Sequence, residues 1–469
     1  MDAKTISGLG RQLDEYLAQF ADCFARRDTR AHLSVYVRGQ MSNLERKSVE
    51  PIALAADVPV RTLQEFLTHL TWDEERMRRR VAEIVARDHA DAESIGLLDE
   101  TSCVKKGEHT PGVQRQYCGA VGKQENCLVT VHLGYAAKDF HCLLDGDLYL
   151  PKSWHEDRAR CRAAGIPDEV VYRPKSEIAL ELYDRARQHG VHFEWLTFDE
   201  WYGAKPEFLR ALDQRGQKYV AEVHKGIVAW IDRPAVTTRP LQGARGRPRK
   251  TPRLRSGSRP AQTLGQLSQA HPKLRDQPWQ TYRIKDTQKG PLVWQVKHVL
   301  VFLKDEQGLP SQPQHLLVCR SPLTGEIKYF LSNAPVDTLV TKLLHVAFSR
   351  WRVERCFEDS KGEIGLTHWE GRRWLGLRRH LILSTVSYLF LAQATQRLAG
   401  KKSRPDRVPT PRGDQRRRPI VVAGQSRHPH TVRVDRTTPP VPPSSQRPRS
   451  PRPYQNHQTP TATTRHKTV

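Results

Sequence analysis

The sequence VDTLVTKLLHVAFSRWRVERCFEDSKG, residues 336–362, decides how the rest of the chain is interpreted. At about 100° per residue, an α-helix places an apolar stripe along its first half: Val336, Val340, Leu343 and Ala347. Continued along the same face, the stripe becomes charged at Arg350, Glu354 and Lys361. A face that contacts a core stays apolar, so this pattern indicates a helix that leaves the core for a functional site. A solvated helix end with local ion pairs is the alternative.

Composition favours a polyanionic partner. The chain has 469 residues, with 76 Lys and Arg against 51 Asp and Glu, and a formal net charge of +25. Such a charge favours nucleic acid or an acidic membrane surface. The longest apolar segment, residues 380–394, is too short to span a bilayer and contains Ser384, Thr385 and Ser387. We therefore expect nucleic acid as the partner and no membrane.

The N-terminal residues contain no basic region followed by an apolar run, so we expect a cytoplasmic protein without a secretory signal. The eight cysteines form no CxxC pair. Reduced thiols are the expected state, and neither a zinc knuckle nor a disulfide framework is indicated.

Residues 1–90 show helical periodicity and predict a helical N-terminal domain. Within it, residues 46–70 contain two short helical patterns broken at Asp57-Val58-Pro59. This arrangement resembles a helix-turn-helix whose second helix, starting near Val60, presents Arg61, Thr62 and Gln64 to a DNA groove. A helical hairpin that only packs is the alternative, and the sequence leaves both open.

Residues 91–225 change to a strand-rich texture and predict the first part of a mixed α/β core. The short apolar strand Ile95–Leu98 is expected to deliver Asp99 at its end. The aromatic-rich run at residues 191–199 is expected to deliver Asp199 in the same way.

Residues 226–332 read as an insertion with a basic linker and β-strands, and residues 333–399 as the helical end of the core. In the linker, RGRPR at residues 245–249 matches an AT-hook core, with Arg245, Arg247 and Arg249 along a DNA minor groove. A basic linker without this specificity explains the composition equally well. Residues 400–469 are rich in Arg, Pro, Thr and Ser and predict a disordered basic tail.

Two strand-end aspartates and one helical glutamate are candidates for a single site: Asp99, Asp199 and Glu354. Converging carboxylates repel one another, and a hard divalent cation such as Mg²⁺ or Mn²⁺ relieves that repulsion. Two such ions about 3.5–4 Å apart activate an attacking oxygen and stabilise a leaving oxygen in phosphoryl transfer. An acid/base glycosidase would explain neither the net charge nor the basic linker.

Five segments resemble the DDE transposases of bacterial insertion sequences: LLDETSCVKKG (97–107), QYCGAVGK (116–123), DLYLPKSWHED (147–157), LTFDEWYG (196–203) and RWRVERCFEDSKGEIGLTHWEGRRWLGLRRH (350–380). The resemblance covers roughly residues 9–399. That family's helix signature places an arginine, three residues, a glutamate, six residues and a lysine in order, which Arg350, Glu354 and Lys361 match. The signature's tyrosine falls at Ala347, where this chain departs from the family.

The resemblance implies an α/β fold with a ribonuclease-H-like mixed sheet, flanking helices and a β-rich insertion before the glutamate helix. It implies that Asp99, Asp199 and Glu354 are the catalytic metal ligands, for Mg²⁺ or Mn²⁺ and two ions. Arg350 and Lys361 would contact DNA phosphates near the scissile bond. Glu358, which lies about 40° round the helix from Glu354, and Asp359 are rivals for the third ligand, and the motif spacing favours Glu354.

The function implied is a transposase that nicks double-stranded DNA at element ends and joins the 3′ hydroxyls to target DNA. It would act in the bacterial cytoplasm at the nucleoid, and a homodimer in the DNA complex is one arrangement that the resemblance allows. A non-catalytic DNA-binding protein derived from a decayed transposase is the alternative, for which the departure at Ala347 leaves room.

Overall fold

The computed structural model describes residues 3–238, 251–287 and 290–402. The predicted AT-hook arginines, Arg245, Arg247 and Arg249, lie outside the described residues, as does the predicted tail from residue 403 onward.

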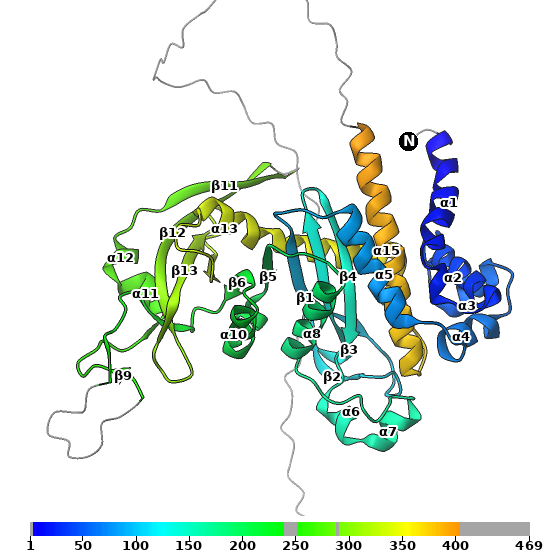
Figure 1. Ribbon diagram of the computed structural model, residues 1–469, viewed down its shortest axis with the longest axis horizontal. Coiled ribbons are helices and arrows are strands. Elements are labelled where there is room, and N and C mark those ends of the chain that lie inside the picture. The colour runs from blue at the N-terminus through cyan, green and yellow to red at the C-terminus, as the bar shows by residue number, and fades with distance from the viewer. Residues whose placement is uncertain (1–2, 239–250, 288–289, 403–469) are drawn as a thin grey trace, which may run out of the picture. The chain divides into compact units, whose positions relative to one another are not determined.

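Five helices open the chain, as the helical periodicity predicts (Figure 1). The turn before the fourth helix contains Asp57 at φ 52°, a left-handed conformation that a short polar side chain tolerates. The fourth helix buries Leu63, Phe66 and Leu67 and leaves Arg61 and Gln64 exposed. The helices are α1 (Ala3–Ala18), α2 (Arg27–Gln40), α3 (Val49–Ala55), α4 (Val60–Thr68) and α5 (Glu74–Asp88).

A mixed sheet follows, and the predicted α/β class is confirmed. Strand β1 pairs antiparallel with β3 and parallel with β5, and β5 pairs parallel with β6. The elements of this part are β1 (Ile95–Val104), β2 (Gln114–Cys118), β3 (Lys123–Ala137), β4 (Phe140–Leu148), α6 (Lys152–Glu156), α7 (Arg158–Ala163), α8 (Lys175–Gln188), β5 (Trp195–Phe198), α9 (Glu200–Gly203), α10 (Pro206–Gln214) and β6 (Lys218–Val223).

Most strands after β6 extend the same sheet, because β14 pairs antiparallel with β6 and is followed by β13 and β12, which brings the described sheet to twelve strands. Strands β8 and β9 pair with each other in a separate two-stranded sheet. The elements are β7 (Val228–Trp230), β8 (Val236–Thr237), β9 (Arg253–Leu254), β10 (Gln262–Thr263), α11 (Leu264–Ala270), α12 (Pro272–Arg275), β11 (Gln280–Thr287), β12 (Gly290–Lys304), β13 (Pro310–Arg320) and β14 (Ile327–Ser332).

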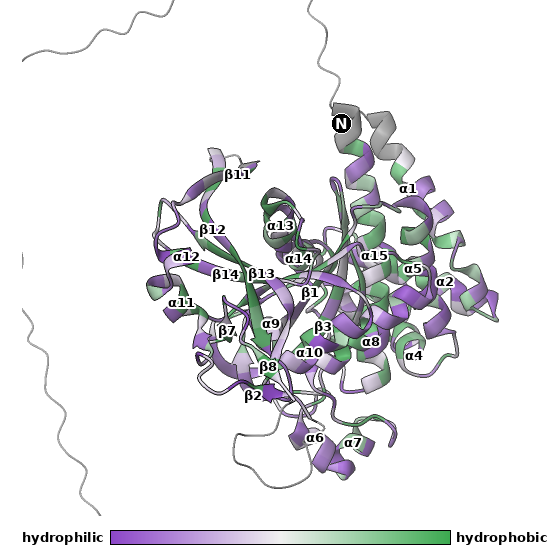
Figure 2. Ribbon diagram, turned by 60° about the vertical axis from the view of Figure 1, so that its left-hand side comes forward, coloured by the Kyte–Doolittle hydropathy of each residue, from purple (hydrophilic) through white to green (hydrophobic). Residues whose placement is uncertain are grey.

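The segment predicted as one helix over 336–362 is divided into several pieces. Helix α13 (Val340–Ala347) is followed by a 3₁₀ turn (Phe348–Arg350), helix α14 (Trp351–Asp359) and a π-helical turn (Ser360–Ile364). The prediction that Val336 packs against the sheet is wrong, because this residue is 56% exposed. A turn in which the Thr338 amide donates to the Pro335 carbonyl delays the helix until Val340. From there Leu343 and Ala347 are buried, and Figure 2 shows α13 as largely hydrophobic.

Helix α15 (Trp374–Lys402) ends the described chain and packs against β4 and against α2, α4 and α5 (Figure 1). No helix among the described residues is both long enough and apolar enough to cross a bilayer.

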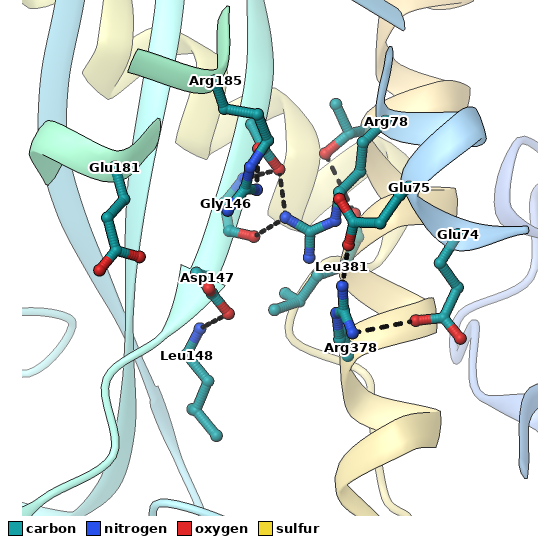
Figure 3. A network of polar contacts seen from close by, with 12 residues as sticks. Glu74, Glu75, Arg78, Gly146, Asp147, Leu148, Glu181, Arg185, Arg378 and Leu381 are labelled. Carbon is teal, nitrogen blue, oxygen red and sulfur yellow. Dashed lines mark hydrogen bonds and ion pairs between the residues drawn. The ribbon is translucent and has the colours of Figure 1, made fainter. Parts of the chain in front are cut away.

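Ion pairs connect the N-terminal helices to the sheet and to α15, and the pair between Arg78 and Asp145 is buried (Figure 3). The Arg78 guanidinium on α5 lies 2.7 Å from the Asp145 carboxylate on β4, and Arg185 of α8 lies 2.5 Å from the same carboxylate. Arg378 of α15 pairs with Glu74 and Glu75 at the start of α5. Because these pairs link four elements, α5, β4, α8 and α15 are held together by charge as well as by apolar packing.

Candidate active site

Asp99 lies inside strand β1, at the point where its pairing with β5 ends. The parallel register pairs Leu98 with Phe198, and Asp99 is the next residue. The strand was expected to end there, but it continues to Val104 because β3 pairs with it over its whole length, with Asp99 opposite His132. The Asp99 side chain is buried, and one of its oxygens accepts a hydrogen bond from the Glu100 amide at 2.7 Å.

Asp199 follows β5 directly, as predicted, and caps the N-terminus of α9. Its carboxylate accepts hydrogen bonds from the Trp201 and Tyr202 amides at 3.1 and 3.3 Å. Helix α9 ends at Gly203. A Cβ atom added at this glycine would lie 2.0 Å from the Glu222 carbonyl oxygen, so α9 packs directly on the backbone of β6. This close approach fixes the position of the Asp199 carboxylate.

The two aspartates interact electrostatically across the β1–β5 pair. Burial, together with the negative charge of Asp199, raises the pKa of Asp99 to about 7. Burial also raises the pKa of Asp199. Two buried carboxylates at one edge of a sheet resist simultaneous ionisation, which is a common property of catalytic sites.

Arg350 connects Asp99 to the helix that follows. Its guanidinium lies 3.0 Å from an Asp99 oxygen and 2.8 Å from an oxygen of Glu354, four residues further along the chain. Arg350 is only 21% exposed at its side chain, whereas the side chain of Glu354 is 58% exposed. Glu354 can therefore rotate, while Arg350 is confined among carboxylates.

A cleft of about 380 Å³ opens beside Asp99 and Glu354, and Asp199 and Arg350 are not among the residues that line it. Lys361 enters it from the π-helical turn, a distortion that often occurs at functional sites. Burial lowers the pKa of Lys361. The cleft is lined by Asp99, Glu100, Thr101, Ser102, Tyr117, Gly119, Ala120, Glu354, Phe357, Glu358 and Lys361.

The two rival carboxylates differ in position. Glu358 lines the cleft together with Glu354, so its position leaves it a candidate. Asp359 lies 2.7 Å from Arg355 and lines a different cavity with it. Ala347 is buried, at 4% exposure, and is not among the residues that line the cleft.

Comparison with known proteins identifies the family. The sequence profile of a family described as DDE superfamily endonuclease matches residues 19–291, a range that includes Asp99 and Asp199. The chain belongs to this family. A probable transposase for insertion sequence element IS701 from Microchaete diplosiphon is 30% identical over 216 residues, which is 45% of this chain and 53% of that protein. The chain thus spans about half the length of this curated relative.

Among solved structures, the cryo-EM structure of the piggyBac transposase synaptic complex with hairpin DNA is similar at 10% identity. The match covers 79% of this chain and 66% of that chain, with a TM-score of 0.38.

The donor set of this DDE superfamily endonuclease suits a hard divalent cation, because Asp99, Asp199 and Glu354 supply only carboxylate oxygens. Over the described ranges, however, no three His, Cys, Asp or Glu side chains lie close enough together to hold one ion. Arg350 lies between Asp99 and Glu354. By donor chemistry the three carboxylates fit such a cation, whereas their positions among the described residues do not form a three-ligand site.

The candidate site contains one more carboxylate that the sequence analysis missed. Glu222 lies on β6, directly after Ala221. Because Ala221 pairs with Phe198 at the end of β5, Glu222 lies one position beyond the β5–β6 pairing. Its carboxylate lies 2.8 Å from Lys328 and 3.9 Å from Arg350. The signal in the sequence was a glutamate inside the apolar strand YVAEV, residues 219–223.

Lys285 on β11 is a second residue that the sequence did not reveal. Its ammonium lies 3.6 Å from the ring centroid of Trp351, the first residue of α14. Burial lowers the pKa of Lys285, and the charge of Glu354 opposes that effect. No local pattern marks this lysine, because its position depends on how β11 packs beside the glutamate helix.

Proposed function

We propose that this endonuclease is a DNA transposase that cleaves insertion-sequence ends and joins the 3′ hydroxyls to target DNA by metal-dependent phosphoryl transfer. One observation carries the proposal: Asp99 and Asp199 follow directly paired positions of β1 and β5, and Arg350 links Asp99 to Glu354. Membership of the DDE superfamily endonucleases and the similarity to an insertion-sequence transposase support it.

The core is proposed to be ribonuclease-H-like. Strands β3, β1, β5 and β6 form adjacent members of one mixed sheet, and α14 packs against β1 and β4. The β-rich segment between β6 and α13 precedes the glutamate helix, as in the family that the sequence resembles.

In this proposal Asp99, Asp199 and Glu354 hold Mg²⁺ or Mn²⁺, with two ions. When bound, such a pair of ions activates the attacking oxygen and stabilises the leaving oxygen. Arg350 neutralises the carboxylates of Asp99 and Glu354 in the protein alone, and its planar fork suits a phosphate equally well. Lys361 supplies a second cation inside the cleft.

The test is Mg²⁺-dependent cleavage and strand transfer on DNA that carries both flanks of the gene. Asp99→Asn, Asp199→Asn and Glu354→Gln are each expected to reduce product by orders of magnitude. Asp359→Asn is the matched control, because this carboxylate lies on α14 but lines another cavity. Wild-type activity in all three variants would overturn the proposal.

Glu358→Gln separates the two glutamates that line the cleft. If Glu354 is the third ligand, Glu358→Gln retains cleavage and Glu354→Gln does not. The reverse result would assign the role to Glu358 and keep the reaction class.

Double-stranded DNA is the proposed partner, in the bacterial cytoplasm at the nucleoid, with a homodimer in the DNA complex. The net charge of +25 supports DNA binding. Affinity is expected to fall steeply with salt, with a logarithmic slope of about −0.9 per phosphate contact. A nearly salt-independent affinity would contradict this partner.

A non-catalytic DNA-binding protein is the second candidate. It is favoured by the absence of a ready three-ligand cluster in the described part of the chain and by the buried alanine at position 347. That protein would bind DNA equally well in EDTA and would cleave it with neither Mg²⁺ nor Mn²⁺.

A further inference from the structure

A row of lysines and aromatic rings begins beside the candidate active site and is not used by the proposed chemistry. It connects α9, the start of α8, the segment after β4 and α6. We call it the lysine–aromatic track, and its members in spatial order are Lys205, Trp201, Lys175, Tyr149, Tyr172 and Lys152.

Each neighbouring pair in the track is in contact. The Trp201 ring centroid lies 5.1 Å from the ammonium of Lys205 and 5.2 Å from that of Lys175. Lys175 also lies 5.4 Å from the ring of Tyr149. Tyr149 meets Tyr172 edge to face at 6.1 Å, and the Lys152 ammonium lies 5.1 Å from the Tyr172 ring. The track is therefore continuous.

The middle of the track is anchored to the active site. The Lys175 ammonium lies 2.6 Å from the carboxylate of Glu100, the neighbour of Asp99. The Trp201 amide donates to the Asp199 carboxylate. Asp99 is adjacent in sequence to Glu100, and Asp199 is two residues before Trp201. Both candidate catalytic aspartates are therefore close in sequence to residues that position the track.

The two ends of the track differ from its middle. Among the described residues, neither Lys152 nor Lys205 has a carboxylate partner within ion-pair distance. Trp201 is 38% exposed and lies on a helix of only four residues. An exposed cation–π contact contributes only about 0.5–1 kcal/mol, so a terminal lysine can leave a ring face for a phosphate at small cost.

We propose that the lysine–aromatic track binds an unpaired DNA strand, with bases stacked on the rings and phosphates on the terminal lysines. Proteins hold single strands by a positively charged surface that follows the backbone and by aromatic faces on which successive bases stack. A duplex offers no free base faces, and an acidic peptide would not need a row of rings. The inference rests on the proposed function, since an unpaired strand arises when DNA is opened beside Asp199.

The isolated cation–aromatic group at Trp279 shows why continuity matters. Its ring lies 4.9 Å from Lys297 and 4.3 Å from Arg320, so its local charge resembles that of Trp201. Its two cations come from β12 and β13, in the segment that follows β6. Trp279 therefore serves as a matched control.

The experiment measures the fluorescence anisotropy of a labelled oligothymidylate with the full chain, in EDTA. Trp201→Ala is expected to weaken binding by about 5- to 150-fold, the range for one stacked base. Trp201→Phe keeps a ring and most of the affinity, and Trp279→Ala leaves it unchanged. Replacing Lys152 and Lys205 together by glutamine lowers the salt slope by about 1.4, at roughly 0.7 per contact for a single strand.

Three results would overturn the proposal: unchanged binding by Trp201→Ala, an equal loss by Trp279→Ala, or an equal loss by Trp201→Ala on a blunt duplex. Thermal unfolding of each variant excludes a loss caused by misfolding. Cleavage assayed in parallel distinguishes the two proposals. If the protein cleaves DNA but Trp201→Ala binds the oligothymidylate as tightly as the wild type does, only the track is refuted. If binding depends on Trp201 but no DNA is cleaved, only the transposase is refuted.

Discussion

Replacing Asp99 by asparagine is expected to stabilise the folded protein, although it removes a proposed metal ligand. Burial and the charge of Asp199 raise the pKa of Asp99 from 3.8 to about 7 in the folded state. Each pH unit between the unfolded and folded values corresponds to about 1.4 kcal/mol. Above pH 7 the ionised carboxylate therefore lowers the free energy of unfolding by roughly 4 kcal/mol, as an upper estimate.

The pH dependence follows from the direction of this shift. The pKa of Asp99 is higher in the folded protein than in the unfolded chain. The destabilisation by the ionised carboxylate is therefore absent below the unfolded-state pKa, grows as the pH rises and is complete above about pH 7. The Asp99→Asn variant should gain stability over that same interval. Asparagine keeps an acceptor for the Glu100 amide. The substitution also removes the ion pair with Arg350, whose effect is already included in the folded-state pKa of Asp99.

The assay is urea unfolding of the wild type and of Asp99→Asn in EDTA, at several pH values between 4 and 8. Asp147→Asn is the control of opposite sign. Burial acts to raise the pKa of Asp147, but the charges of Arg78 and Arg173 outweigh it and hold the pKa below its usual value. Loss of that carboxylate should destabilise the protein at neutral pH, with a smaller effect as pH falls. A stability gain of Asp99→Asn that is absent at pH 8, or that does not vary with pH, would refute the reasoning.

Three further predictions follow from contacts in the structure. Arg78→Ala removes one of the two arginines that pair with the buried Asp145 carboxylate, and Arg185 remains. The variant should lower the free energy of unfolding in urea by less than the roughly 3–5 kcal/mol of a fully broken buried pair. Gly203→Ala forces a Cβ atom against the Glu222 carbonyl, and it should lower the free energy of unfolding by about 1–3 kcal/mol and reduce cleavage. Gly362→Ala is the control, because its Cβ atom meets no atom within 4 Å, and it should change neither stability nor cleavage. Lys361→Gln should reduce the salt slope of duplex binding by about 0.9, because one phosphate contact is lost.

The sequence contained much of the information that places the site. The apolar runs before Asp99 and Asp199 are strands, and their parallel pairing brings the two aspartates to the same level of the sheet. Arg350 and Glu354 lie on one helix face, as their spacing predicts, but they form an ion pair with each other, which is the contact that the alternative interpretation of this helix expects. The roles of these residues remain predictions, since the geometry alone does not assign a ligand.

Other features depended on packing that no local pattern records. A uniform rotation of about 100° per residue cannot anticipate the 3₁₀ turn at residues 348–350 or the π-helical turn at residues 360–364. The turn at Pro335 exposes Val336, although its spacing matched the apolar stripe. Glu222 and Lys285 reach the site through strands that are distant in sequence, so their proximity is a property of the sheet order.

Helix α15 connects α4 and β4 as one continuous packed element. It packs against α4 on one side and against β4 on the other, and ion pairs secure it to α5. Because a packed helix is stiff, the outer face of α4 and the cleft at Asp99 are separated by a set span rather than by a flexible tether. Under the proposed function, and if α4 contacts DNA as the helix-turn-helix prediction states, a duplex that touches both surfaces would be cut at a constant number of base pairs from the sequence bound by α4.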